Sequence, residues 1–300
     1  MKELYIELKN QGYKGQIVSV HRLSELEREI KHLHSHGLFS EEFYKKWLTS
    51  FKFNPPATLP GAKSLIVVAF PQPQHRAIFN WRGKRLPLLI PPTYLHYPDQ
   101  KIEEILEGIL NPLGFRLAKT ELPLKLLATR GGLGSYGKNN ICYIPGMGSF
   151  HRLMAFFSDL PFAEENWQDS KMMERCQNCS ACLKSCPTGA ITDERFLLRA
   201  ELCLTFLNEG KGDFPSWINP SWHNCLVGCM NCQKVCPENK KFKGWIEDKE
   251  EFSEKETRLL LDGISQNNLP IQTLRKIENL DLIEYFDLLP RNLRVLIDLF

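Results

Sequence analysis

Apolar residues recur at helical spacing in three segments of the N-terminal part of the chain. Over LEREIKHLHSHGL this period follows a capping box of Ser24 and Glu27, and it predicts an amphipathic helix that ends near Gly37. The segments EEFYKKWLTSF (41–51) and QKIEEILEGIL (100–110) show the same period. We therefore expect three helices here.

Two continuous apolar runs and one alternating segment indicate strands. SLIVVAF (64–70) and RLMAFFSDL (152–160) are short, apolar and rich in strand-forming residues, which is typical of buried strands. AIFNWRGKRLPLLI (77–90) alternates on both sides of Gly83 and predicts a β-hairpin with that glycine in its turn. Helices and strands together favour an α+β fold built in layers.

The composition changes twice along the chain. From about Glu165 the sequence becomes a series of short cysteine-rich turns, and after NKKFKGW a capping box of Ser253 and Glu256 introduces helical patterns that run to Phe300. These changes predict three segments, over 1–164, 165–245 and 246–300.

Length and charge limit the possible functions. A chain of 300 residues with 43% hydrophobic content can bury a large core. Its 38 basic and 35 acidic residues leave a net charge of +3, far from the balance of a dedicated nucleic-acid binder. The segment MKELYIELKNQGYKG has no signal-peptide pattern and no run is long enough to span a bilayer, so we expect a cytoplasmic protein with no membrane partner.

Ten cysteines in a reducing compartment point to metal or redox chemistry, because disulfides rarely persist there. All but Cys142 fall between Cys176 and Cys236. The run CQNCSACLKSCP has the C-x-x-C-x-x-C-x-x-x-C-P spacing of bacterial ferredoxins, in which three close cysteines hold one [4Fe-4S] cubane and the fourth binds the other cubane. Zinc and disulfides are the weaker alternatives, because this spacing is not that of a zinc ribbon.

A second motif, CLVGCMNCQKVCP, supplies the remaining ligands. Cys225 lies one residue too far upstream for the standard gap, so Cys203 is the better candidate for the missing position. We assign cluster A to Cys176, Cys179, Cys182 and Cys236, and cluster B to Cys186, Cys203, Cys229 and Cys232. Cys142 and Cys225 are left over, and we expect each to be a small buried apolar residue.

The loop GGLGSYGKNN (131–140) is a candidate cofactor site. Four glycines in seven residues let the backbone approach a bulky ligand closely, and two polar side chains offer contacts to a phosphate-bearing or amide-rich cofactor. A plain structural turn is the alternative, and no clear βαβ unit surrounds the loop to make it a dinucleotide site. The candidate residues are Gly132, Gly134, Ser135, Tyr136, Gly137, Lys138 and Asn139.

Four stretches of the chain resemble epoxyqueuosine reductases. LPLKLLATRGGLGSYGKNNICYIPGMGSFHRLMAFFSDLPF is similar to the family's segment with an AGLGWIGKN-type loop. LPGAKSLIVVAFP looks like its first central strand, CLTFL from Cys203 resembles its R-C-I-S-Y-L-T segment, and GCMNCQKVCPENKKF resembles G-C-D-D-C-Q-x-V-C-P-W-N. These motifs occur in the family's order and cover about 59–242.

The resemblance, which extends to the related reductive dehalogenases, implies a fold and a cofactor set. It implies a nitroreductase-like α/β domain with a cobalamin site over 1–164, a ferredoxin-like double-cluster domain over 165–245 and a helical C-terminal extension. Electrons would pass from an external flavodoxin or ferredoxin through the two clusters to cobalt and then to the substrate. The expected activity is that of an oxidoreductase.

The chain also departs from the family's pattern. The family's R-D-Y-H run, whose aspartate is the proposed proton donor, is replaced by PPTYLHYPDQ, so we take His96, Tyr97 and Asp99, with Tyr94 nearby, as candidate donors. About sixty residues follow the last cysteine without a basic stripe, which argues against tRNA as the substrate.

The leading hypothesis is therefore a cobalamin-dependent iron–sulfur reductase of an undetermined small-molecule or protein substrate. Two alternatives stay open. One is an electron-transfer protein that reduces a partner corrinoid or flavoprotein, which predicts that side chains fill the space around Gly134, Tyr136 and Lys138. The other is a genuine epoxyqueuosine reductase in tRNA modification.

Overall fold

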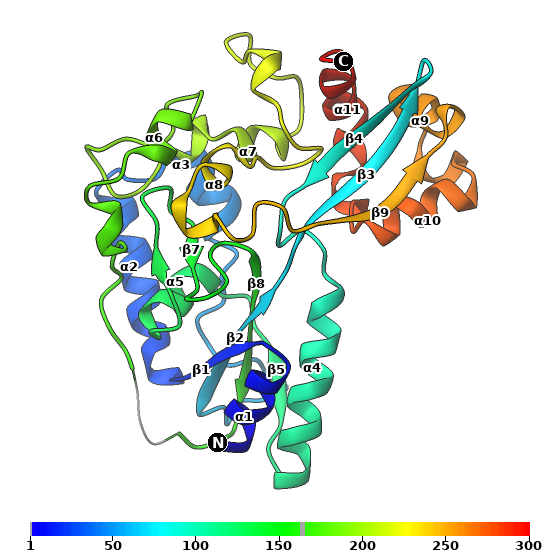
Figure 1. Cartoon of the computed structure of the whole chain (residues 1–300). Helices are drawn as coiled ribbons and strands as arrows, with labels where there is room; N and C mark the ends of the chain where they lie inside the picture. The colour runs from blue at the N-terminus through cyan, green and yellow to red at the C-terminus, as the bar shows by residue number, and fades with distance from the viewer. Residues whose placement is uncertain (1, 163–165) are drawn as a thin grey trace. The chain divides into compact units, whose positions relative to one another are not determined.

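A four-stranded antiparallel sheet forms the centre of the first of two units in this computed structural model, which describes residues 2–162 and 166–300. The strand order is β1-β2-β8-β5 (Figure 1). The inner strand β2 is buried from its first residue to Phe70, which confirms the predicted central strand, and β8 confirms the strand predicted over 152–160. The strands are β1 (Lys14–Ser19), β2 (Ser64–Pro71), β8 (His151–Ser158) and β5 (Leu117–Lys119).

Helices cover both faces of this sheet because β2 is apolar on both sides. Leu65 and Val67 belong to a core shared with α2 and α5, whereas Ile66 and Val68 belong to a core shared with α1 and α4. Each such buried side chain stabilises the fold by about 1.5–3 kcal/mol. The covering helices are α1 (Lys2–Asn10), α2 (Leu23–Ser35), α4 (Tyr97–Leu110) and α5 (Leu124–Arg130).

The predicted capping box of Ser24 and Glu27 is wrong. A 3-10 turn capped by Ser19 precedes the helix, and α2 already begins at Leu23. Ser24 therefore lies inside the first turn, where its hydroxyl donates to the carbonyl of His21 at 3.4 Å. The predicted end of the helix is confirmed, since Gly37 has a φ of +67° just beyond it.

The other two predicted helices are present with shifted ends. Residues 41–51 form a short α-helix, α3 (Glu41–Phe43), which continues as a π-helix, η2 (Tyr44–Leu48). Helix α4 begins at Tyr97 rather than at residue 100, because Pro98 is tolerated in the first turn, where its missing N–H is not needed.

The predicted hairpin opens the second unit. Strands β3 (Gln74–Trp81) and β4 (Lys84–Ile90) pair in antiparallel register around Arg82 and Gly83, whose φ angles are +49° and +73°. Two consecutive positive φ angles are typical of the type I′ turn, which matches the natural twist of the flanking strands.

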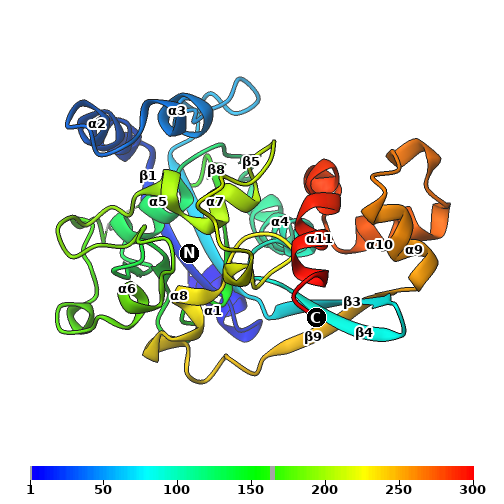
Figure 2. The ribbon, with the colours of Figure 1, turned by 90° about the horizontal axis from the view of Figure 1, so that it is seen from above.

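A third strand, β9 (Ile246–Phe252), pairs with β3 in parallel and was not predicted (Figure 2). Its sequence IEDKEEF carries too many carboxylates to resemble a strand. Arg76 pairs with Asp248, and Arg85 pairs with Glu251 at 3.0 Å, which balances this charge.

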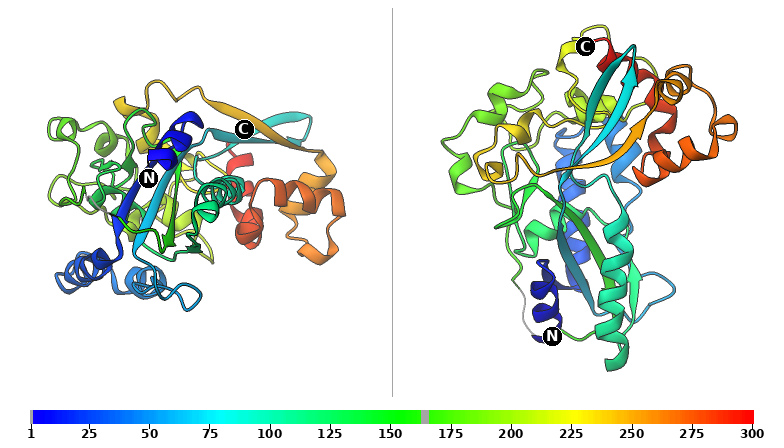
Figure 3. Two further views of the ribbon diagram at one scale, coloured as in Figure 1. Left: turned by 90° about the horizontal axis from the view of Figure 1, so that it is seen from below. Right: turned by 45° about the vertical axis from the view of Figure 1, so that its right-hand side comes forward.

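Three C-terminal helices pack on the same small sheet and complete the core of the second unit (Figure 3). The predicted capping box is confirmed, because Glu256 N–H donates to Ser253 Oγ and Ser253 N–H donates to Glu256 Oε2. The prediction of a purely helical segment over 246–300 missed β9. The helices are α9 (Glu254–Leu261), α10 (Ile271–Asn279) and α11 (Leu289–Ile297).

The remaining elements are short. Two small strands are β6 (Ser135–Tyr136) and β7 (Cys142–Tyr143), and three single-turn helices are α6 (Ala181–Ser185), α7 (Leu204–Asn208) and α8 (Asn231–Lys234). Turns of 3-10 helix are η1 (Val20–Arg22), η3 (Asn111–Leu113), η4 (Glu174–Cys176), η5 (Ala200–Leu202), η6 (Pro220–Trp222), η7 (Pro237–Asn239), η8 (Gln266–Asn268) and η9 (Ile283–Leu288).

The two units interleave along the chain, and the mixed α/β character predicted from the sequence is confirmed. The predicted boundary at 164 and 165 falls outside the described residues, so the three-segment division stays a prediction. Within the described ranges, no helix combines the length and the apolar character needed to cross a membrane. Unit 1 comprises Met1–Gln72, His96–Ser180 and Glu194–Ala200, and unit 2 comprises Pro73–Leu95, Ala181–Asp193 and Glu201–Phe300.

Candidate metal centres

Helix α7 presents the thiol of Cys203 at its N-terminus. Cys203 is the N-cap, and the backbone N–H groups of Thr205 and Phe206 lie near its sulfur, where they lower the pKa of the thiol without capping the helix through a side-chain hydrogen bond. Burial raises the pKa of Cys203 to about 11, and the nearby thiols of Cys229 and Cys186 add to the rise while the two N–H groups oppose it. Three of the four cysteines predicted for cluster B thus interact with one another within unit 2.

Hydrogen-bond donors also surround the other two thiols. Cys229 Sγ accepts from the N–H of Asn231 at 3.5 Å and from the side-chain amide of Asn224 at 3.3 Å. Cys186 Sγ lies 3.5 Å from Thr188 Oγ1. N–H groups aimed at sulfur stabilise the negative charge of thiolate-bound iron clusters, so these surroundings fit a [4Fe-4S] group.

The two cysteine motifs are tied together through α6 and α8. The hydroxyl of Ser185, next to Cys186, donates to the carbonyl of Asn231 at 2.8 Å. Cys232 lies on the same helix α8. All four predicted ligands of cluster B therefore lie in unit 2, on segments that contact one another.

Cluster A draws on both units, since Cys176 and Cys179 belong to unit 1 and Cys182 and Cys236 to unit 2. Its assembly stays a prediction. None of the ten cysteines, all of which lie in the described ranges, forms a disulfide. Across the same ranges, no three His, Cys, Asp or Glu side chains are grouped so as to hold a single metal ion.

The two spare cysteines are buried. Cys142 lies on β7 in the core of unit 1, where burial raises its pKa to about 12. Cys225 is 1% exposed, and its thiol donates to Asn224 Oδ1 at 3.2 Å. Burial raises the pKa of Cys225 far above its usual value, and the neighbouring Cys229 adds to this effect. Neither thiol is set up as a nucleophile.

Helix α11 holds two cluster-bearing segments together, a feature that the sequence did not suggest. The side-chain amide of Asn292 donates to the carbonyls of Asn208 at 3.1 Å and Leu226 at 3.0 Å. The amide of Asn208 in turn donates to the carbonyl of Gly228 at 2.7 Å. Arg291 also donates to backbone carbonyls at and after the end of α7, namely those of Leu207, Asn208, Gly210 and Gly212.

The glycines of the candidate cofactor loop pack against the chain itself. A Cβ atom on Gly134 would lie 2.7 Å from the carbonyl oxygen of Tyr143 and 3.0 Å from Cys142 Sγ. A Cβ on Gly137 would lie 2.6 Å from the ring of Tyr143. The space that these two glycines leave open is therefore filled by β7, which explains them without a ligand.

The polar residues of this loop are used inside unit 1. Asn139 is buried, and its amide donates to the hydroxyl of Tyr143 at 3.0 Å. Asn140, with a φ of +54°, donates to the carbonyl of Phe196 at 2.7 Å. Ser135 and Tyr136 form β6, which pairs with β7. Gly132 faces Asn166, and Lys138 is half-buried.

The candidate proton donors lie at the start of α4. Asp99 accepts two hydrogen bonds from the guanidinium of Arg152, at 2.5 and 2.7 Å. Tyr97 is 48% exposed, with its ring against the edge of Phe70, and His96 is the exposed N-cap of the helix. Both carboxylate oxygens of Asp99 are thus engaged by this ion pair within unit 1. Of the three, His96 and Tyr97 are the better donors.

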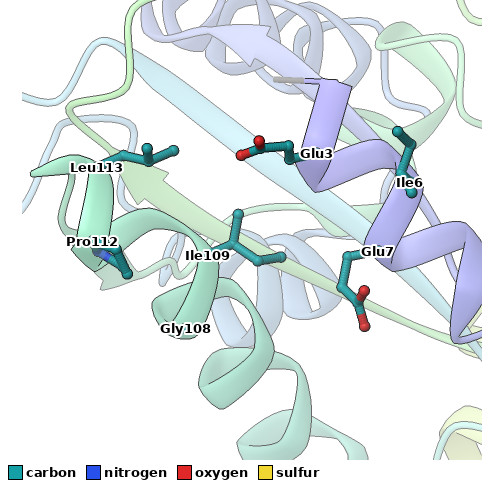
Figure 4. A pocket seen from close by; sticks show the side chains of 7 residues that line it. All are labelled: Glu3, Ile6, Glu7, Gly108, Ile109, Pro112 and Leu113. Carbon is teal, nitrogen blue, oxygen red and sulfur yellow. The ribbon is translucent and has the colours of Figure 1, made fainter.

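A hollow of about 500 Å³ lies between α1 and the end of α4 (Figure 4). Glu3, Ile6 and Glu7 line one side and Ile109 and Leu113 the other. None of the predicted site residues lines it. It therefore does not belong to the candidate chemistry.

Three histidines missed by the sequence reasoning are buried. His75, His151 and His223 are each less than 7% exposed, and burial lowers the pKa of each to about 4. Each is therefore neutral at neutral pH.

Comparison with known proteins identifies the cysteine-rich region and its relatives. Residues 175–239 match the family described as "4Fe-4S double cluster binding domain". An epoxyqueuosine reductase of Bacillus cereus is 31% identical over 198 residues, which cover 62% of this chain and 51% of the relative. One of Pseudomonas aeruginosa is 36% identical over 144 residues, which cover 47% of this chain and 39% of the relative.

Solved structures resemble the chain over more of its length. An epoxyqueuosine reductase from Bacillus subtilis, with its catalytic loop swung out of the active site, matches with a TM-score of 0.69 and 23% identity, over 99% of this chain and 80% of that one. A selenomethionine-labelled epoxyqueuosine reductase matches with a TM-score of 0.60 and 25% identity, over 80% and 66%. The chain is thus a homologue of epoxyqueuosine reductases, which are oxidoreductases, and it spans about half the length of the curated relatives it matches.

Proposed function

We propose that this protein is an iron–sulfur oxidoreductase that reduces epoxyqueuosine. The observation that carries the proposal is the convergence of Cys186, Cys203 and Cys229, with two hydrogen-bond donors at the sulfur of Cys229 and the hydroxyl of Thr188 beside that of Cys186. The names of the relatives favour this alternative over a reductase of an undetermined substrate.

The chain's own residues would hold the clusters and tune them. Cys186, Cys203, Cys229 and Cys232 would bind cluster B, and the other four predicted cysteines would bind cluster A. When bound, cubane clusters pass single electrons. The N–H group of Asn231 and the side-chain amide of Asn224, which donate to Cys229, would favour the reduced, more negative state by lowering its electrostatic cost.

Reduction of an epoxide to an alkene consumes two electrons and two protons and releases water. The clusters supply only the electrons. The two protons require a proton donor in addition. We assign this role to His96 or Tyr97, because both are exposed, whereas Asp99 is held by Arg152.

The resemblance to epoxyqueuosine reductases also implied a cobalamin site. The proposed function does not depend on cobalamin, and its binding is tested separately. The glycines at Gly134 and Gly137 are accounted for by their packing against β7, so these residues do not form a cradle for a corrin ring. When bound, cobalamin would supply a strongly reducing centre.

The same packing favours a second candidate function. An electron-transfer protein that reduces a partner corrinoid or flavoprotein needs clusters but no substrate pocket, and it predicts that protein fills the space around Gly134. The two functions differ in whether the chain alone, supplied with electrons, changes epoxyqueuosine.

The deciding experiment supplies anaerobically purified protein with a chemical reductant and with epoxyqueuosine, either as the free nucleoside or in a tRNA anticodon stem loop. We expect mass spectrometry to detect loss of one oxygen atom from the base in at least one of the two forms. Intact clusters with both forms unchanged would contradict the proposal and favour the electron-transfer function. Restoration of queuosine in a host that lacks its own epoxyqueuosine reductase provides an independent check.

A further inference from the structure

Basic side chains gather in the segment that contains and follows the last two predicted cluster ligands, Cys232 and Cys236. Four lysines occur between residues 231 and 245 against one carboxylate, that of Glu238. This local excess equals the net charge of +3 of the whole chain. We name this segment, with Lys184 on α6, the basic surface; its lysines are Lys184, Lys234, Lys240, Lys241 and Lys243.

These five lysines all belong to unit 2. Lys184 and Lys234 stand in the last turns of α6 and α8, which lie side by side and are joined by the hydrogen bond of Ser185 to Asn231 (Figure 1). Lys240, Lys241 and Lys243 follow α8 and are exposed on the stretch that leads into β9.

The acidic residues next to this stretch do not neutralise it. On β9, Asp248 is paired with Arg76 and Glu251 with Arg85. Glu247 is paired with Lys249 at 3.4 Å, and Glu250 accepts a hydrogen bond from Asn279. Among the residues that the structure describes, no carboxylate lies in ion-pair contact with Lys240, Lys241 or Lys243. The positive charge is therefore available to a partner.

An apolar centre and cluster ligands lie within this basic surface. Val235 is 39% exposed, and Phe242 and Trp245 are half-buried with their rings 6.5 Å apart. Cys232 and Cys236, one predicted ligand of each cluster, are half-buried in the same stretch. A small apolar centre ringed by one sign of charge suits a brief encounter with a protein of opposite charge.

We propose that the basic surface is the docking site of an acidic electron-carrier protein of the flavodoxin class, an inference that rests on the proposed iron–sulfur function. Lys240, Lys241 and Lys243 steer the carboxylates that surround the carrier's flavin, and Val235 lies at the point of contact beside the cluster ligands. Each encounter moves one electron from the carrier's reduced flavin to one cubane. The carrier is oxidised by one electron and the cluster is reduced by one. RNA is the other polyanion that lysines attract, but the predicted cluster ligands Cys232 and Cys236 in this stretch favour a redox partner over a substrate strand.

The test compares the charge-reversal variant K240E/K241E/K243E with a control that changes net charge equally, K9E/K101E/K255E, whose three lysines are exposed on α1, α4 and α9. Titration calorimetry of the cluster-loaded proteins with an acidic flavodoxin at low salt should show affinity at least tenfold weaker for the first variant and within twofold of wild type for the control. The affinity of the wild type should fall with rising salt, and that of the first variant should change less.

Three further measurements keep the outcomes distinct. The rate of cluster bleaching by reduced flavodoxin should fall at least tenfold in K240E/K241E/K243E, while bleaching by dithionite should not change. Unchanged flavodoxin affinity in this variant would overturn the docking proposal. Loss of affinity for a tRNA anticodon stem loop, with flavodoxin binding intact, would assign the surface to RNA and overturn it equally. Absence of any dithionite-bleachable absorbance in the wild type would instead remove the proposed function itself.

Discussion

The side-chain amide of Asn292 donates to the carbonyl of Asn208, a residue 84 positions earlier in the chain, at 3.1 Å. Its second hydrogen bond, to the carbonyl of Leu226 at 3.0 Å, reaches the segment that leads to Cys229. Helix α7, which ends at Asn208, carries Cys203 at its other end. One buried side chain near the C-terminus thus fixes the spacing of two predicted ligands of cluster B.

Replacing Asn292 by Ala should therefore release cluster B. The substitution removes the Asn292 donor from the buried carbonyl of Leu226, at a cost of about 1–3 kcal/mol, whereas the carbonyl of Asn208 keeps its hydrogen bond from Arg291. We expect N292A to lose a large part of its iron, and the electron paramagnetic resonance signal of one reduced cluster to broaden or disappear. The control is N279A on α10, which removes an exposed hydrogen bond to Glu250 on β9. Full iron content in N292A, with unfolding like that of N279A, would show that α11 does not position the ligands.

The choice of Cys203 over Cys225 as a ligand predicts a contrast between two alanine variants. C203A should retain about half of the iron of the wild type, because one of two cubanes loses a thiolate. C225A should keep the full amount. In the wild type the Cys225 thiol is buried and donates a hydrogen bond to Asn224 Oδ1, so it is not expected to bind iron. The reverse result in iron and sulfide analysis would exchange the two assignments.

The glycine at position 134 should be needed for folding. In G134A the new Cβ would lie 2.7 Å from the carbonyl oxygen of Tyr143, and backbone cannot move aside cheaply. We expect unfolding to become easier by about 1–3 kcal/mol in urea titrations. G61A is the matched control, because nothing lies within 4 Å of the new Cβ there. If G134A is as stable as G61A, the packing explanation of this loop is wrong and a ligand role regains support.

Buried histidines should make the protein sensitive to mild acid. Burial lowers the pKa of His151 to about 4 in the folded state, while histidine in the unfolded chain titrates near its ordinary pKa of 6.5. Between these values the unfolded state binds more protons, so stability present above pH 6.5 is lost progressively as the pH falls toward 4. The loss is about 3 kcal/mol for a fully buried imidazole. Urea unfolding at several pH values should show it, and H151Q should reduce the slope of stability against pH. An unchanged slope in H151Q would show that His151 does not cause the loss of stability in mild acid.

A measurement of cobalamin binding tests whether the glycine loop (131–140) is a cofactor site. Because β7 fills the space at Gly134 and Gly137, we expect the purified protein to bind cobalamin weakly or not at all in equilibrium dialysis. Stoichiometric cobalamin that co-purifies with the protein would contradict this reading of the loop. It would also restore the cofactor that the sequence resemblance implied.

Local patterns predicted local structure well. The apolar run of β2 and the turn at Arg82 and Gly83 depend on neighbouring residues, so periodicity was enough to find them. The ligand spacing from Cys176 to Cys186 is local as well, which is why the cluster motif could be recognised.

Features that depend on distant partners could not be found in this way. Strand β9 is acidic and is stabilised by Arg76 and Arg85, more than 160 residues earlier. The roles of Arg291 and Asn292 require carbonyls more than 60 residues away. The loop at Gly134 illustrates a third case, since its composition suggested a ligand whereas its glycines make room for β7.

The central claim is that the chain binds two [4Fe-4S] clusters through eight of its ten cysteines. Iron and acid-labile sulfide analysis of anaerobically purified protein, combined with Mössbauer spectroscopy, tests it most directly. We predict about eight iron atoms and about eight sulfides per chain, all in cubane environments. Four or fewer irons per chain, or a preparation that contains only zinc, would contradict the account.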